Sequence, residues 1–185
     1  MVKIMNRTLA ITMLVLICLV SPLLAETEAM KELKVLAEKG DAESQFTLGL
    51  AYATGQGVPQ DYIEAAKWIH KSAEQGGSYA QDYLGSMYED GKGLNKDYIM
   101  AARYYLKAAQ QSNASAQHNL GRLYVFGQGV PRNFIIGYMW LSLAAQSGDN
   151  KALALMDKLK EVMTPQQINE ARKLAQEWKP GKMIF

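Results

Sequence analysis

Few residues in this 185-residue sequence are of the types that usually carry out catalysis or bind metal ions. The histidines are His70 and His118, which lie far apart in the chain, and the single cysteine is Cys18. Neither histidine lies in a motif that joins it to a nucleophilic serine, and no pair of carboxylates has a spacing that identifies a glycosidase. Catalytic and metal sites need several such side chains to converge at one place. We therefore expect no catalytic residue, no metal site and no cofactor, and we expect that the protein is not an enzyme.

The glycine-rich segments are the other feature with a possible chemical use, because backbone amides at the start of a helix can bind phosphate. A Gly-x-Gly motif begins at Gly55, at Gly91 and at Gly127. Each motif follows the expected end of a helix, where the helix dipole is negative and disfavours phosphate. A glycine at this place can adopt the left-handed backbone conformation that ends a helix. We therefore interpret the motifs as helix caps rather than as phosphate-binding loops.

An internal repeat contains these glycines. The motif Leu-Gly-x-x-Tyr begins at Leu48, Leu84 and Leu120, so each copy lies 36 residues after the one before. A period in this range is typical of a solenoid built from helix pairs. The same interval separates three Asp or Asn residues, three aromatic residues and three alanines: Asp61, Asp97 and Asn133; Trp68, Tyr104 and Trp140; Ala73, Ala109 and Ala145.

The spacing of apolar residues within each repeat is that of helices. Leu48, Ala51 and Tyr52 follow the i, i+3, i+4 pattern, and the segment after the glycines follows it too. The pattern predicts first helices near 42–54, 78–90 and 114–126, and second helices near 61–75, 97–111 and 133–147. We expect the Asp or Asn at the start of each second helix to cap it by accepting backbone hydrogen bonds.

A glycine also recurs inside each expected first helix, at Gly49, Gly85 and Gly121. Glycine there costs about 1 kcal/mol relative to alanine. Its recurrence at one register predicts that the partner helix approaches closely at this point.

Together, the Leu-Gly-x-x-Tyr, Gly-x-Gly, Asp and Ala-Ala-x-Trp motifs resemble the Sel-one-like repeat, a relative of the tetratricopeptide repeat. The resemblance implies an all-α protein, an alpha-alpha superhelix with three full repeats and helical caps. The expected organisation, in chain order, is a signal peptide (1–25), an N-terminal capping helix (26–40), repeats at 41–76, 77–112 and 113–148, a degenerate C-terminal repeat or helix pair (149–180) and a tail (181–185).

The two caps have their own signals. Leu33 aligns with Ile69 of the first repeat, which predicts a solitary second helix over residues 28–39. At the other end, Thr164 and Gln167 can form a capping box around the proline that follows Thr164, which predicts a last helix running to Trp178. Terminal units of a solenoid are atypical because one of their sides has no neighbour.

The N-terminal segment has the layout of a signal peptide. Lys3 and Arg7 precede an uncharged, mostly apolar run from Thr8 to Ala25, and Ala25 is a small residue at which cleavage is plausible. The alternative is an uncleaved membrane anchor, since the run approaches the minimum of about 17 residues that spans a bilayer. Both interpretations place the rest of the chain outside the cytoplasm, in the periplasm or secreted.

Cleavage after Ala25 would change both the cysteine content and the charge. Cys18 lies in the apolar run behind the bulky Ile17, which disfavours a lipoprotein, and its removal leaves no cysteine for a disulfide. Loss of Lys3 and Arg7 lowers the basic count from 20 to match the 18 acidic residues. The mature chain is then close to neutral and lacks the basic signature of a nucleic-acid-binding protein.

A binding site is expected where the repeats differ, because the recurring aromatic residues belong to the core. In the tetratricopeptide class that the repeat resembles, the first helices line the concave face. Apolar side chains among polar ones suit a protein or peptide partner, although the alternative is that some of them pack between repeats. The variable residues on that face are Phe46, Leu50, Tyr79, Asp82, Ser86, Glu89, Asp90, His118, Arg122 and Phe126.

The sequence therefore predicts a non-catalytic interaction module, scaffold or regulator of the bacterial cell envelope. The expected partner is a protein or peptide, from the envelope or from a host, bound on the concave face. Nucleic acid is not expected as a partner. Contact with a membrane is expected only through an uncleaved N-terminal segment. The alternative is a β-lactam-binding or cell-wall-related enzyme like the cysteine-rich Sel-one-like relatives. Those relatives carry regularly placed cysteine pairs, which the mature chain lacks, so this alternative is disfavoured.

Overall fold

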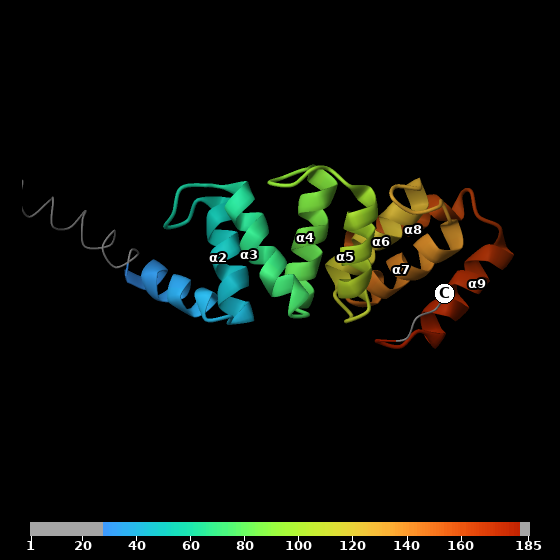
Figure 1. Cartoon of the computed structure of the whole chain (residues 1–185). Coiled ribbons are helices and arrows are strands. Elements are labelled where there is room, and N and C mark those ends of the chain that lie inside the picture. Colours follow the sequence, from blue (N-terminus) through green and yellow to red (C-terminus); the bar gives the residue numbers. More distant parts are fainter. Residues whose placement is uncertain (1–27, 182–185) are drawn as a thin grey trace, which may run out of the picture.

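The computed structural model describes residues 28–181, and all regular secondary structure within that range is helical. The helices pack as successive pairs along one axis, from the blue N-terminal helix to the red α9 (Figure 1). This is the all-α arrangement of helix pairs that the sequence predicts. The helices are an unlabelled one over 28–38, then α2 (Ala42–Thr54), α3 (Tyr62–Glu74), α4 (Ser78–Asp90), α5 (Tyr98–Ala109), α6 (Ala114–Phe126), α7 (Phe134–Gln146), α8 (Asn150–Lys160) and α9 (Pro165–Glu177).

The described range does not include the expected signal peptide over 1–25, and it includes only Gly181 of the expected tail. Within the described range, no helix is both long and apolar enough to span a membrane.

Each repeat is a first helix followed by a second, in the pairs α2/α3, α4/α5 and α6/α7. The first helices have the predicted bounds, and the second helices each begin one residue later than predicted. The reason is that Asp61, Asp97 and Asn133 are N-caps with extended backbone rather than first helical residues. The Asp61 carboxylate, for example, accepts hydrogen bonds from the amides of Ile63 and Glu64 at 2.8 and 3.0 Å.

The glycines have the two roles that their positions predict. Gly55, Gly91 and Gly127 end the first helices with φ values of 75°, 73° and 69°. Inside the helices, the predicted close approach of the second helix is confirmed. A Cβ atom on Gly49, Gly85 or Gly121 would lie 2.4 Å from Ile69 Cγ1, 2.7 Å from Tyr105 Cδ1 or 2.8 Å from Leu141 Cγ, respectively.

A ladder of glutamines fixes each repeat to the one before it. Gln45, Gln81 and Gln117 lie buried at one register of the first helices. Their side-chain amides donate to the carbonyl oxygens of Ala37, Ala73 and Ala109, at 3.0, 3.1 and 3.3 Å. These carbonyls lie near the ends of the preceding second helices, where helix geometry leaves backbone acceptors free. The ladder therefore satisfies buried polar groups while it sets the stacking distance between repeats.

The recurring aromatic residues form the core, as expected. Trp68, Tyr104 and Trp140 are buried, while Tyr52, Tyr88 and Tyr124 are half-buried at the margins of the core clusters. At the C-terminus, the capping box at Thr164 is present, and Trp178 packs edge-on against Trp140 with ring centroids 5.8 Å apart. Among the described residues 28–181, the core clusters are made of residues between Met30 and Trp178, and a chain that begins at Glu26 contains all of them.

Candidate functional site

The candidate site is the surface formed by α2, α4 and α6, which we call the first-helix face. We call the part of it between α2 and α4 the first groove, and the part between α4 and α6 the second groove. The buried glutamine ladder recurs in each repeat, so the backbone is stacked in a similar way at both. The residues that line the two grooves differ in chemistry.

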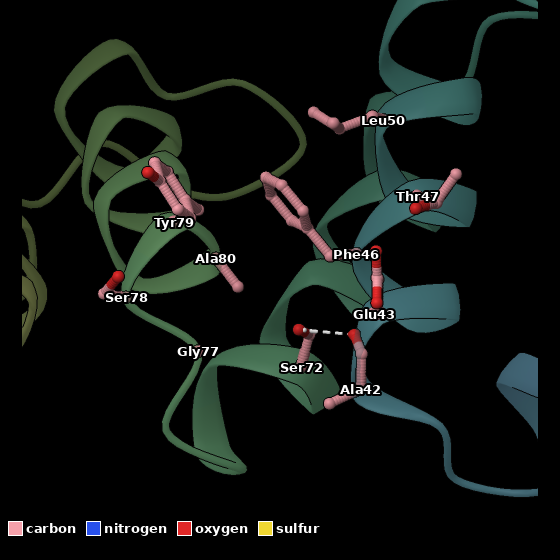
Figure 2. Close-up of a pocket in the computed structure, with 10 residues that line it drawn as sticks. All are labelled: Ala42, Glu43, Phe46, Thr47, Leu50, Ser72, Gly77, Ser78, Tyr79 and Ala80. Atoms are coloured by element: carbon pink, nitrogen blue, oxygen red, sulfur yellow. Dashed lines mark hydrogen bonds between the residues drawn. The ribbon is translucent and has the colours of Figure 1, made fainter.

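The first groove holds an open, largely apolar pocket of about 510 Å³. Phe46 and Leu50 lie one turn apart on α2, and Tyr79, in the first turn of α4, lies across the pocket from them (Figure 2). Tyr79 is 74% exposed although it is a large aromatic residue. The other residues that line the pocket are Ala42, Glu43, Thr47, Ser72, Gly77, Ser78 and Ala80.

The frame of this pocket is fixed by contacts below it. Phe46 packs against Tyr83 of α4 in an edge-to-face arrangement, with ring centroids 6.2 Å apart. The Ser72 hydroxyl donates to the carbonyl oxygen of Ala42 at 2.8 Å, which ties the end of α3 to the start of α2 (Figure 2). Gly77, in the turn before α4, lines the pocket together with Ser72. These contacts connect the walls that α2 and α4 supply.

Polar side chains fill the second groove at the equivalent positions. Asp82 occupies the place that Phe46 has one repeat earlier, and Asn119 occupies the place of Tyr83. The Asn119 side-chain amide donates to Asp82 Oδ1 at 3.3 Å, so a hydrogen-bonded pair replaces the aromatic pair. Burial raises the pKa of the Asp82 carboxyl, while hydrogen bonds from Ser115 and Asn119 oppose that change.

Farther along the second groove, Glu89 of α4 and Arg122 of α6 form a close ion pair in which both carboxylate oxygens accept from one guanidinium nitrogen. The buried Tyr105 of α5 donates its hydroxyl to Glu89 Oε2 at 3.0 Å. Burial, and then the Glu89 charge, raise the pKa of the Tyr105 hydroxyl. A second Arg122 nitrogen donates to Gln128 Oε1 at 3.3 Å. The donors and acceptors at this point of the face are thus used within the molecule.

The other residues singled out from the sequence lie apart from the pocket. Ser86 donates to the Tyr83 carbonyl oxygen of its own helix at 2.7 Å, and Asp90 pairs with its neighbour Lys92 at 2.8 Å. His118 Nδ1 lies 3.1 Å from Asp149 Oδ2, in an orientation that makes no hydrogen bond. Phe126 is 58% exposed at the end of α6. The structure therefore brings together Phe46, Leu50 and Tyr79, and separately Glu89 and Arg122.

Two contributors to the first-helix face were missed from the sequence. Glu43 lines the pocket and occupies the register of Tyr79 one repeat earlier, so alignment of the repeats alone could have identified it. Tyr105 was missed because its equivalents, Ile69 and Leu141, are aliphatic core residues. No sequence pattern shows that its hydroxyl reaches Glu89.

The comparisons with known proteins agree with the repeat seen in the structure. A family model described as the Sel1 repeat matches residues 42–77, 78–113 and 114–149, each one residue later than the repeat boundaries expected from the sequence. A comparison with curated proteins found no match.

Solved structures resemble the chain over most of the described range. The antigen c5321 of uropathogenic Escherichia coli, described as protective and as displaying an SLR fold, has a TM-score of 0.68 and 37% identity over 69% of this chain. This chain spans only 27% of c5321. A Sel1 repeat protein from Oxalobacter formigenes has a TM-score of 0.65 and 36% identity over 70% of this chain and 98% of its own length.

Cysteine rich protein B of Helicobacter pylori has the same fold at lower similarity. Its TM-score is 0.57 and its identity 22%, over 70% of this chain and 96% of its own length. At this level of identity the likeness concerns the fold alone.

Proposed function

The chain belongs to the Sel1 repeat family, and we propose that it is a non-catalytic scaffold that binds a protein or peptide of the cell envelope or of a host on its first-helix face. The observation that supports this most directly is the apolar pocket of the first groove, which Phe46, Leu50 and the exposed Tyr79 line. Protein partners commonly place one or two large side chains in a preformed pocket, and these contacts supply most of the affinity.

The size of the pocket favours a small contact. Its volume of about 510 Å³ is within the usual range of ligand pockets, roughly 300–1,000 Å³. Beside it, in the second groove, Asp82 is paired with Asn119 and Glu89 is paired with Arg122. A short extended segment or a single helix that inserts one apolar side chain fits this surface better than a broad domain interface does.

The proposed location is the periplasm or the exterior of the cell. Its support is the pattern of Lys3, Arg7 and the apolar run that ends at Ala25. The description of the relative c5321 as a protective antigen is compatible with an exported protein.

The test is affinity capture from an envelope extract with the chain from Glu26 onward, compared with Tyr79→Ala. Because Tyr79 is 74% exposed, its loss should leave the fold intact. Ile99→Ala is the matched control, since Ile99 is 67% exposed on a second helix, away from the pocket. A partner that the unaltered chain and Ile99→Ala retain but Tyr79→Ala loses supports the proposal. A partner that all three retain contradicts the pocket as the binding site.

A further inference from the structure

The first two helices of the first-helix face carry charge of one sign. α2 and α4 contain the carboxylates Glu43, Asp82, Glu89 and Asp90 and no lysine or arginine. The second helices of the same repeats are different: α3 and α5 contain four basic residues, Lys67, Lys71, Arg103 and Lys107, beside two glutamates. The two faces of the first two repeats therefore differ in charge, and the acidic one contains the pocket.

Two of the four carboxylates are already neutralised. Glu89 pairs with Arg122, and Asp90 pairs with Lys92. Asp82 faces the second groove, where it accepts a hydrogen bond from Asn119. Glu43 takes part in no ion pair with a lysine or arginine within residues 28–181. Glu43 is therefore the carboxylate of this face that remains available to a cation from outside.

Glu43 lies at the apolar pocket itself. It lines the pocket from the first turn of α2, and its side chain is exposed. A cation placed beside Glu43 would be attracted to the carboxylate, whereas an acidic segment would be repelled by it.

We propose that the occupant of the pocket is a polypeptide segment with a large apolar side chain that fills the space between Phe46 and Tyr79, next to a lysine or arginine that pairs with Glu43. This inference rests on the proposed function and adds the chemistry of the partner to it. The apolar side chain supplies most of the affinity because it leaves water, and the cation fixes the direction of the segment along the groove.

The test begins with a random-peptide library displayed on phage and selected on the folded chain from Glu26 to Phe185. Peptides whose binding is lost with Tyr79→Ala and kept with Ile99→Ala are then synthesised and titrated by fluorescence anisotropy. We expect these peptides to share an aromatic or large aliphatic residue with a lysine or arginine within a few positions. Replacing the apolar residue by alanine should weaken binding about tenfold or more.

The charge contacts are tested on the protein side. Glu43→Gln should weaken binding of the selected peptide about threefold, as expected for an exposed ion pair, and added salt should reduce the difference. Glu64→Gln is the matched control, because Glu64 also lies in the first turn of its helix but on the second-helix side. Replacing the cation of the peptide by alanine should remove the effect of Glu43→Gln.

The outcomes separate the two proposals. If the selected peptides carry the apolar residue without any basic neighbour, or if Glu43→Gln does not weaken their binding, the charge inference is wrong and the scaffold proposal survives. If no peptide depends on Tyr79, the pocket is not a peptide-binding site and both proposals are contradicted.

Discussion

The first and second grooves of the first-helix face share one backbone frame and differ in almost every side chain that lines them. In the first groove, Phe46 meets Tyr83 ring to ring, and an open pocket remains beside them. One repeat later, the same two positions are the hydrogen-bonded Asp82 and Asn119. One groove thus offers apolar surface to a partner, whereas the other uses its polar groups within the molecule.

The comparison separates two kinds of residue in this repeat. Residues that recur at every repeat, such as the first-helix glycines and the buried glutamines, set how closely the helices stack. Residues that change from repeat to repeat decide what each groove can bind. Ala53 and Glu89 illustrate the second kind: they occupy one register, but only Glu89 reaches across to Arg122.

The largest effect is expected from breaking the frame that both grooves share. Gly93 follows α4, the helix common to the two grooves, and has a φ of 70°. In Gly93→Ala, the added Cβ would lie 1.9 Å from the backbone carbonyl oxygen of Tyr62, which cannot move without displacing α3. We expect a loss of about 3 kcal/mol or more in the free energy of unfolding, measured by urea denaturation.

Gly57→Ala is the matched variant, since Gly57 has a φ of 72° at the same register of the first repeat. Its added Cβ would meet only the flexible end of Met30, 2.9 Å away, so the expected cost is the backbone conformation alone, about 1–2 kcal/mol. Equal losses in the two variants would show that the contact with Tyr62 does not hold the repeats together.

The next largest effect tests the polar side of the comparison. Glu89→Ala places in the second groove the alanine that the first repeat has at that register, Ala53. It leaves the Tyr105 hydroxyl without its acceptor and the Arg122 guanidinium without its carboxylate partner. We expect a loss of about 2 kcal/mol in the free energy of unfolding, because partly buried polar groups lose hydrogen bonds to a charged partner. Thermal unfolding followed by circular dichroism measures this change.

A triple variant is the control for Glu89→Ala. It combines Glu89→Ala with Arg122→Leu and Tyr105→Phe, so that apolar side chains replace all three members of the polar cluster. Leucine is chosen for position 122 because Leu50 occupies the same register in the first repeat. Removing all the partners of a polar network costs less than removing one, so this variant should regain part of the stability. A triple variant less stable than Glu89→Ala would mean that the groove lacks the space for an apolar core.

The variant Tyr79→Ser should change binding with little change in stability. It places in the first groove the residue type that Ser115 supplies at the same register of the second groove. Because Tyr79 is 74% exposed, the free energy of unfolding should change by about 0.5 kcal/mol or less. Affinity for a peptide selected on the pocket should fall about tenfold, or 1.4 kcal/mol, in a fluorescence titration. A large loss of stability would instead make Tyr79 a packing residue.

The recurring part of the molecule could be predicted from the sequence because each element is specified three times. Helix bounds, N-caps such as Asp61 and the close contact at Gly49 all follow from residues with fixed roles in every repeat. The repeat also identified Tyr79 as a variable residue on the correct helix. The pocket beside it could not be predicted, because its walls come from both α2 and α4 and their separation is a property of packing.

The pairing of variable residues could not be predicted for a related reason. Glu89 and Arg122 are both variable residues of the first-helix face, and the sequence treats both as available to a partner. Whether two such side chains meet depends on the offset between neighbouring repeats and on the Tyr105 hydroxyl behind them. Contacts of this kind lie between positions that are not equivalent in the repeat, so the period carries no signal for them.

The smallest expected effect is on the pH dependence of the free energy of unfolding. For this prediction, the carboxylates to compare are Asp82 and Glu74. Burial raises the pKa of Asp82 in the folded state above its usual value of 3.8, so the folded state binds its proton more tightly than the unfolded state does. Asp82 therefore contributes less stability as pH rises from about 3.8 through its folded pKa. Asp82→Asn, which can still accept from Asn119, should gain stability relative to the unaltered chain across that window, by about 0.5 kcal/mol at neutral pH.

Glu74→Gln should show the opposite slope. Lys107 lowers the pKa of Glu74, so that carboxylate contributes stability above its unfolded pKa, and this contribution is lost as pH falls through the folded pKa. With rising pH, the free energy of unfolding of the unaltered chain should therefore increase relative to that of Glu74→Gln and decrease relative to that of Asp82→Asn. Urea titrations at a series of pH values measure both differences. Parallel slopes would contradict the burial of Asp82 in the second groove. This small effect therefore tests whether the second groove holds a buried carboxylate at the position where the first groove holds the ring of Phe46.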